Sequence, residues 1–395
     1  MTRSTLPLLL LVCACADPLL PGEHERPPAP LQPGVPEAAA CALDEAATTL
    51  IVTTTDLATG AVTVVDAAGQ VHADVAVGSS DAIPYSGPDG PVIVHRHQFD
   101  YVDVLAAGTW RSRGQFALST DDAASPNPQA IAFDEDGLGY VTLFASRLLL
   151  VLDPTAPPTD AVVDAIDLSP FADDDGVPEA GVAVRCGDTL WVGVQQIEVP
   201  GYASLGPDTL VAVDLRTRLP WDFDPDAPGG QGLPLLGTWL KQVHRDPADP
   251  TALYGLTAGL EHIDLERLES SWVVPPEAFA AVGAGSYMQP MAFALGPEGR
   301  WAWVAAYVSE DGFDFHHGQL FEVDLTADAP SLQPFGAPFQ ALDRPLARIG
   351  DTLWVGSRET EAPGLSSYDL TTHPPTRTAG PLSTGLPPYS LTAVP

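Results

Sequence analysis

The sequence predicts an all-β ring of seven similar sheets, closed by its own C-terminal strand. Three observations favour this fold class. The 395 residues include 41 Pro and 35 Gly, so about one residue in five is a turn former, which is typical of many short strands. Short apolar segments recur about every 40 to 60 residues, which indicates a repeat architecture. The tail supplies one apolar segment more than the repeats require, which predicts closure.

Composition excludes several classes of protein. The chain carries 52 acidic against 17 basic residues, for a net charge of -35. Nucleic acids and anionic membrane surfaces would be repelled by this charge, so neither is an expected partner. Hydrophobic residues make up 45% of the chain, including 13 Phe, 9 Tyr and 8 Trp, which is enough apolar material for a core and excludes general disorder.

Residues 1–15 carry an export signal. Arg3 is followed by an apolar run from Leu6 to Val12, which is much shorter than the ~20 residues of a membrane span. The segment resembles a bacterial lipoprotein signal, because Val12-Cys13-Ala14-Cys15 places a small residue before Cys15. The resemblance implies lipidation at Cys15 and an outer-membrane lipoprotein held to the membrane by its lipid alone. The alternative is an ordinary secretory signal cleaved nearby, and both predict export to the cell envelope.

The rest of the chain divides into a tether and a ring. Residues 16–47 are rich in proline and lack a periodic apolar pattern, so they are expected to form an extended tether and lead-in. Residues 48–395 form the ring. Its strongest repeat is Gly-Asp-Thr-Leu-Trp-Val-Gly at 187–193, which recurs at 350–356. Looser copies of this strand lie at 49–52, 91–94, 138–141, 252–255 and 301–304, which makes seven units.

Two further strands are predicted in each unit. The strand after the Trp-Val strand usually ends in aspartate, at Asp66, Asp153, Asp214, Asp264, Asp324 and Asp369. We interpret these as turn formers rather than catalytic acids, because aspartate readily accepts backbone hydrogen bonds in turns. A third strand precedes the units, at 130–133, 181–184, 291–294, 346–349 and, at the tail, 389–394. The first unit lacks this strand, so the tail is expected to pair with residues 48–55.

These strand-only repeats resemble β-propellers of the seven-bladed, YVTN-repeat and lactonase-like type. The resemblance covers residues 48–395 and implies an architecture more than a chemistry, since propellers include enzymes, ligand binders and scaffolds. It implies a ligand face at the end of the central channel where the Trp-Val strands finish.

Two cysteines remain after the signal. Cys186 ends an inner strand, and Cys41 lies seven residues before the strand that begins at Thr48. Inner strands end on the face opposite the ligand face, so both cysteines are expected there, and seven extended residues reach ~23 Å. We predict a Cys41–Cys186 disulfide, as an exported protein permits. The alternative is a buried apolar thiol at Cys186.

Three acidic clusters are candidate calcium sites, at Asp173–Asp175, Asp222–Asp226 and Asp311–Asp314. Calcium requires six to eight converging oxygens, and none of the three shows a complete loop pattern. We therefore favour solvated loops and predict neither a cofactor nor a metal. His316 and His317 are adjacent on an extended segment, so they point to opposite faces and are poor metal ligands.

Candidate ligand-binding residues follow from the position of each unit in the ring. One candidate in each unit lies three positions after the aligned Val (Gly in one unit): Thr55, His97, Phe144, Gln195, Ala258, Tyr307 and Arg358. Three more, Glu179, Gln289 and Arg344, lie where inner strands begin at the same mouth. Insertions at 196–208 and 308–318 add Tyr202, Phe313 and Phe315. Such variable positions form either a site or drifting loops.

The sequence favours a binding scaffold for a small polar ligand or an envelope protein. The alternative is a lactonase-like hydrolase, for which His97, Glu179 and Arg358 are the candidate catalytic residues. No Gly-x-Ser-x-Gly elbow, phosphate loop or haem-attachment motif occurs.

Overall fold

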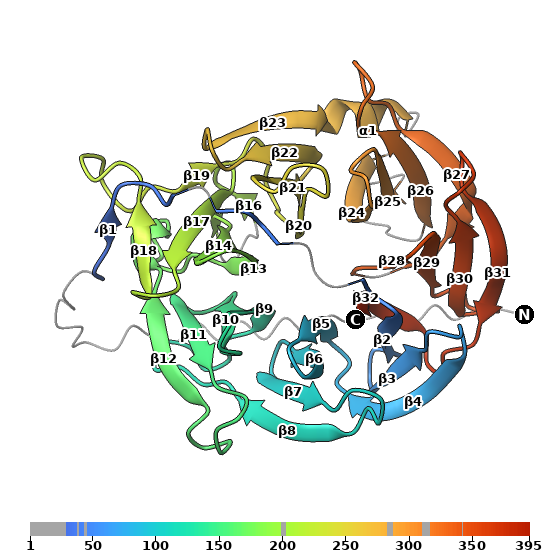
Figure 1. Cartoon of the computed structure of the whole chain (residues 1–395), viewed down its shortest axis with the longest axis horizontal. Coiled ribbons are helices and arrows are strands. Elements are labelled where there is room, and N and C mark those ends of the chain that lie inside the picture. Colours follow the sequence, from blue (N-terminus) through green and yellow to red (C-terminus); the bar gives the residue numbers. More distant parts are fainter. Residues whose placement is uncertain are drawn as a thin grey trace, which may run out of the picture.

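The computed structural model describes residues 29–37, 39–42, 46–198, 203–282, 287–309, 317–341 and 343–395. In these ranges the strands form seven sheets of four or more strands, arranged around a central axis, and one two-stranded ribbon (Figure 1). The chain is therefore an all-β, seven-bladed propeller, as the sequence predicts.

The seven sheets, numbered here as blades in chain order, each begin with an inner strand at the axis. Blade 1 contains β32 (Pro388–Val394), β2 (Thr49–Thr55), β3 (Gly60–Val65) and β4 (Val71–Gly78); blade 2 contains β5 (Ala82–Gly87), β6 (Gly90–His95), β7 (Tyr101–Leu105) and β8 (Ser112–Ala117). Blade 3 contains β9 (Pro128–Phe133), β10 (Gly139–Leu143), β11 (Leu148–Leu152) and β12 (Val162–Asp167). Blade 4 contains β13 (Ala180–Cys186), β14 (Thr189–Val194), β17 (Thr209–Asp214) and β18 (Leu219–Asp222), with β19 (Leu233–Pro234) beside β17.

The remaining blades follow the same plan. Blade 5 contains β20 (Gln242–Arg245), β21 (Ala252–Leu256), β22 (Leu260–Asp264) and β23 (Glu269–Val274); blade 6 contains β24 (Tyr287–Leu295), β25 (Trp301–Ser309), β26 (His317–Asp324) and β27 (Gln333–Phe339). Blade 7 contains β28 (Leu346–Ile349), β29 (Thr352–Ser357), β30 (Gly364–Asp369) and β31 (Thr376–Leu382). The ribbon, β15 (Ile197–Glu198) with β16 (Ala203–Ser204), rises from the 196–208 insertion.

Helix is limited, in the described residues, to α1 (Pro276–Val282) and the 3-10 turn η1 (Ser169–Phe171). Neither element has the length and apolar character of a membrane-crossing helix. The strands β25 and β26 extend further than the sequence predicted, so the base of the 308–318 insertion continues the sheet of blade 6.

The ring closes through the tail. β32 pairs antiparallel with β2, with Leu391 opposite Val52 and Ala393 opposite Leu50. The predicted pairing of the tail with residues 48–55 is confirmed. Because β32 covers the inner edge of β2, that edge is not available for pairing with another chain.

The core lies between neighbouring blades. Apolar side chains of adjacent sheets interdigitate there, and the two Trp of the repeated strands, Trp191 and Trp354, are 3% and 9% exposed. Trp303 occupies the related position in blade 6 and is 2% exposed. Each repeat therefore buries its Trp-Val strand against a neighbour, which explains why this segment recurs in the sequence.

The strand-closing aspartates are turn formers, as predicted. The Oδ1 atom of each accepts the backbone N–H of the residue two positions on, an Asx turn that begins the loop after the strand. These six carboxylates stabilise the turns that follow the strands; Asp214 is buried.

The lead-in crosses the face opposite the Trp-Val strand ends, which we call the far face. Residues that the sequence placed in the tether dock on blade 4, where β1 (Gln32–Pro33) pairs in parallel with β18. The predicted disulfide is present: Cys41 is bonded to Cys186, 145 residues away. From there the lead-in passes across the ring toward β2 of blade 1 (Figure 1).

Candidate functional site

All seven inner strands run in the same direction, so the residues just before them lie on one face of the ring. The residues that end the second strand of each blade reach this face too. We call the centre of this face the mouth. It is the face on which the sequence placed the candidate ligand-binding residues.

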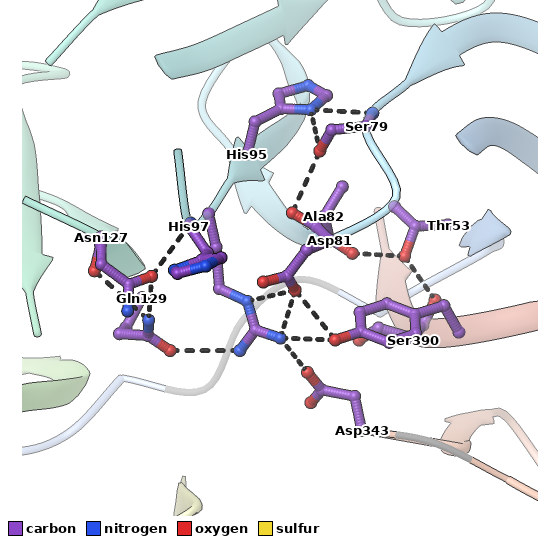
Figure 2. A network of polar contacts seen from close by, with 12 residues as sticks. Thr53, Ser79, Asp81, Ala82, His95, His97, Asn127, Gln129, Asp343 and Ser390 are labelled. Carbon is purple, nitrogen blue, oxygen red and sulfur yellow. Dashed lines mark hydrogen bonds and ion pairs between the residues drawn. The ribbon is translucent and has the colours of Figure 1, made fainter. Parts of the chain in front are cut away.

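A buried arginine organises one side of the mouth (Figure 2). Arg96, which follows β6, donates from Nε to Asp81 Oδ1 at 2.8 Å, and its Nη1 donates to Gln129 Oε1 at 3.1 Å. Its Nη2 donates to Asp343 Oδ2 and to Tyr389 Oη, both at 2.6 Å. These residues belong to blades 1, 2, 3 and 7, and we call them the Arg96 cluster.

Backbone bulges aim two members of this cluster at the arginine. Gln129 is an extra residue in β9, between Pro128 and Ala130, and Tyr389 is an extra residue in β32. A β-bulge turns a side chain away from the regular alternation of a strand. The same irregularity recurs at Gly181 in β13 and Met291 in β24, so it is a feature of the repeat that only some blades use for polar contacts.

Ion pairs and hydrogen bonds stabilise the Arg96 cluster. Burial disfavours the charge of Arg96, whose side chain is 15% exposed, but Asp343, Tyr389 and Asp81 outweigh it and raise the pKa of the guanidinium. Tyr389 also donates from Oη to Asp81 Oδ1 at 2.8 Å, and burial raises the pKa of its phenol. Each donor and acceptor therefore has a charged or polar partner, which makes this cluster a rigid part of the mouth.

The opposite side of the mouth holds three ionisable groups with shifted pKa values. Burial raises the pKa of Glu179, before β13, to about 8, and that of Asp208, before β17, to about 7. Burial lowers the pKa of Lys241, before β20, to about 7, against the attraction of Asp208. The Lys241 ammonium donates to the Pro290 carbonyl at 2.8 Å. All three exchange protons near neutral pH, as groups at functional sites often do.

The three predicted catalytic candidates lie at the mouth but do not form a joined set. His97 is exposed, and its backbone N–H donates to Asn127 Oδ1 at 3.0 Å. Glu179 is 1% exposed and accepts from the Ile197 N–H at 3.4 Å. Arg358 donates from Nη1 to carbonyls of Thr55, Pro387 and Pro388, next to the closure. No hydrogen bond or ion pair connects His97, Glu179 and Arg358 in the described structure.

The other predicted residues divide between structural and mouth positions. Thr55 is buried in β2, and Gln195 donates to the Leu240 carbonyl at 2.8 Å, so both support the blades. Phe144 is half-buried after β10, and Gln289 lies in β24. Tyr307 and Arg344 lie nearest the axis: Arg344 Nη1 donates to Tyr85 Oη at 2.9 Å, and burial raises the pKa of the Tyr307 phenol.

The sequence did not identify Asp81, Arg96, Gln129, Asp343, Tyr389, Asp208 or Lys241. One signal was available for Lys241, since it is the only lysine in a chain of net charge -35. Tyr202, Phe313, Phe315, His316 and the 311–314 acidic cluster lie outside the described residues, as does Cys15.

The described residues contain no group of three or more His, Cys, Asp or Glu placed to hold a metal ion. In two of the acidic clusters the carboxylates accept backbone N–H groups instead. Asp173 Oδ1 accepts from Asp175 N at 3.0 Å, and Asp222 Oδ1 accepts from Gln231 N at 3.0 Å.

No model of a known protein family matches the chain, and no curated protein matches it. Solved structures do. A periplasmic gluconolactonase from Pseudomonas aeruginosa is similar with a TM-score of 0.58 and 16% identity, over 87% of this chain and 98% of that one. A functionally unknown protein from Desulfotomaculum acetoxidans has a TM-score of 0.57 and 9% identity, over 88% and 99%.

A protein from Lactobacillus plantarum has a TM-score of 0.51 and 12% identity, over 87% of this chain and 98% of that one. At these identities the likeness shows the propeller fold alone.

The Arg96 cluster predicts a large stability loss when its cation is removed. In Arg96→Gln the partly buried carboxylates of Asp81 and Asp343 lose their partner, so we expect the free energy of unfolding to fall by about 3 kcal/mol, the lower end of the range for a buried pair. Urea unfolding at pH 7 measures this. The control is Arg113→Gln, whose ion pair with Asp89 is exposed and should be worth under about 1 kcal/mol. Equal effects of the two variants would contradict the role given to Arg96.

Glu179 predicts a pH-dependent stability. Its pKa is about 8 in the folded protein against an ordinary 4.5, so the folded state keeps a proton that the unfolded state releases in this window. Its contribution to stability is therefore present below pH 4.5 and is lost as the pH rises to 8. Between pH 5 and pH 8 we expect the free energy of unfolding of Glu179→Gln to rise by about 2 to 3 kcal/mol relative to that of the wild type.

Urea unfolding across this pH range measures the difference between the two proteins. The exposed Glu266→Gln is the matched control and should track the wild type. A Glu179→Gln difference that stays constant with pH would show that Glu179 is ionised in the folded protein.

Proposed function

We propose that this propeller binds a small polar ligand, anionic or rich in hydroxyl groups, at the mouth. One observation carries the proposal: four of the 17 basic residues, Arg96, Lys241, Arg344 and Arg358, lie at the mouth of a strongly acidic chain. Arg358 and Lys241 donate to carbonyls alone and, in the described part of the chain, have no carboxylate within ion-pair distance. Cations held this way retain their attraction for an incoming anion.

The Arg96 cluster supports this function as a scaffold. Its own donors and acceptors are used within the cluster, so it holds blades 1, 2, 3 and 7 in a fixed geometry. A site positioned by rigid elements loses less freedom when a ligand binds. In this proposal Arg358, Lys241, His97 and Tyr307 offer contacts to the ligand, with Thr55, Phe144, Gln195, Gln289 and Arg344 supporting them.

Lactone hydrolysis at the same mouth is the second candidate function. It is favoured by the pKa values of Glu179 and Lys241, which lie near neutral pH and suit proton transfer. The fold is also that of a lactonase-like propeller. In this form His97 or Glu179 acts as the base and Arg358 stabilises the developing oxyanion. We also propose that the repeats are of the YVTN type.

A ligand screen by thermal shift separates the candidates. The panel contains sugar lactones and the matching open-chain hydroxy acids, with pH-stat detection of lactone opening. We expect a hydroxy acid or lactone to raise the melting temperature of the wild type, and Lys241→Met to abolish the rise. Lys241 makes only one side-chain hydrogen bond, so this variant should keep the fold.

The matched control is Arg267→Met on an exposed turn of blade 5, which should bind like the wild type. Lactone opening that disappears in both His97→Ala and Glu179→Gln would favour the hydrolase. If no member of the panel shifts the wild type, small-ligand binding at the mouth is wrong. The remaining hypothesis is then a scaffold that binds an envelope protein through the 308–318 insertion.

We further propose that the protein is exported and tethered to the envelope by a lipid on Cys15. The buried Cys41–Cys186 disulfide supports export, because disulfides persist in oxidising compartments. Expression with a radiolabelled fatty acid tests the anchor. We expect label on the wild type and its recovery with membranes, and neither for Cys15→Ser. A labelled Cys15→Ser protein would contradict lipidation at this residue.

A further inference from the structure

A cavity of about 660 Å³ occupies the central channel on the side of the far face. All seven inner strands contribute to its wall, mostly through their second halves, and Ala46 and Ala47 of the lead-in lie beside it. Asp81, Arg96, Asp343 and Tyr389 do not line it, so the cavity is separate from the Arg96 cluster. Its volume is in the range of pockets that hold small organic ligands.

The charge of the wall is opposite to that of the protein. The lining includes Arg185, Arg245, Arg344 and Arg348, and none of the Asp or Glu residues that the structure describes. The chain has 52 acidic and only 17 basic residues, so a lining with four arginines and no acidic residue among those described is a strong departure from its composition. An anion that is repelled by the outer surface finds a positive lining here.

Three of these arginines occupy the same position in different blades. Arg185, Arg245 and Arg348 each lie opposite a leucine of the second strand, at Leu190, Leu253 and Leu353. The equivalent inner-strand residues opposite Leu50, Gly139 and Ala302 are Ala393, Phe133 and Leu295, and these too line the cavity. One level of the channel therefore carries arginines on blades 4, 5 and 7, apolar residues on blades 1, 3 and 6, and Tyr85 on blade 2.

Arg348 is the arginine most available to a ligand. Its Nη1 donates to the Gly350 carbonyl at 2.8 Å, and no ion pair with a carboxylate occurs in the described structure. Arg185 makes the equivalent bond to the Gly187 carbonyl at 2.7 Å and also pairs with the exposed Glu135. Burial lowers the pKa of Arg348 and outweighs the attraction of Asp351.

Much of the remaining wall is apolar and built from small side chains, and Ser86, Gln242, His244 and Thr392 add polar groups. Ala132, Ala183, Ala294 and Ala347 face the space together with Leu391 and Phe293. Small residues on converging strands keep the channel from being filled, and the apolar surface favours a hydrocarbon over water.

We propose that this cavity binds an amphipathic monoanion, with its carboxylate, sulfate or phosphate at Arg348 and its hydrocarbon part against the alanines of the inner strands. The site is distinct from the mouth and does not depend on the function proposed there. A hydrocarbon chain would pack against the apolar wall, and a single negative group would pair with the arginine side chains. A fully hydrophilic anion would leave the alanine wall without a partner.

Titration calorimetry with dodecanoate on the full mature chain tests the proposal. We expect saturable binding of one molecule per chain to the wild type and none of dodecyltrimethylammonium, which has the same chain and the opposite charge. Arg348→Gln should weaken dodecanoate binding at least about tenfold, the effect of losing one charge-assisted hydrogen bond. Arg113→Gln, an exposed arginine elsewhere on the ring, is the matched control and should leave the affinity unchanged.

A second variant tests the location without removing a charge. Ala183→Phe projects a ring into the cavity and should abolish binding, and its melting temperature shows whether the ring still folds. If Ala183→Phe does not fold, Ala347→Leu is the smaller substitution that fills the cavity. Absence of saturable dodecanoate binding to the wild type overturns the proposal, as does equal binding by the wild type, Arg348→Gln and the filled variant. Lys241→Met should not affect dodecanoate, so the outcome is independent of the ligand test at the mouth.

Discussion

Pairing of β32 with β2 is the constraint on which the rest of the structure depends. It fixes the distance of all seven inner strands from the axis, and both the mouth and the far cavity are spaces defined by that distance. The Arg96 cluster lies across this closure, because Tyr389 comes from the closing strand and Asp343 from the blade before it. Hydrogen bonds of the backbone close the ring, and one buried guanidinium sets the geometry of its mouth.

The sequence predicted those features that repeat or that depend on local chemistry. The Trp-Val strands and the closing aspartates recur, so each copy supports the others, and the Cys41–Cys186 bridge followed from the direction of the strands. The mouth was predicted less well. Counting along the repeat selected His97, whereas the central residue is Arg96, and neighbouring residues of an extended chain point in opposite directions. The bulges at Gln129 and Tyr389 leave no pattern in the sequence, and the contact of Arg96 with Asp343 spans 247 residues.

Cations are present at the centre of both faces of this acidic ring. Most of the closing aspartates lie in exposed turns between the strands, where they accept backbone N–H groups. Six arginines and the single lysine lie at the mouth or around the far cavity. A negative exterior repels nucleic acids and anionic surfaces over long distances, whereas a small ligand that reaches the axis meets fixed cations at short range. The composition that excludes large polyanions is therefore compatible with recognition of small anions.

The two central spaces share a wall, which decides how the channel can be used. Tyr85 and Arg344 line the far cavity and are hydrogen-bonded to each other. Arg344 also lies 3.8 Å from Asp343, which belongs to the Arg96 cluster. Continuous polar contacts thus join blade 2 to blade 7 between the cavity and the mouth. Moving a ligand from one space to the other would require these contacts to break, at a cost of several buried hydrogen bonds. The geometry therefore favours two separate pockets with a common partition over a single pore.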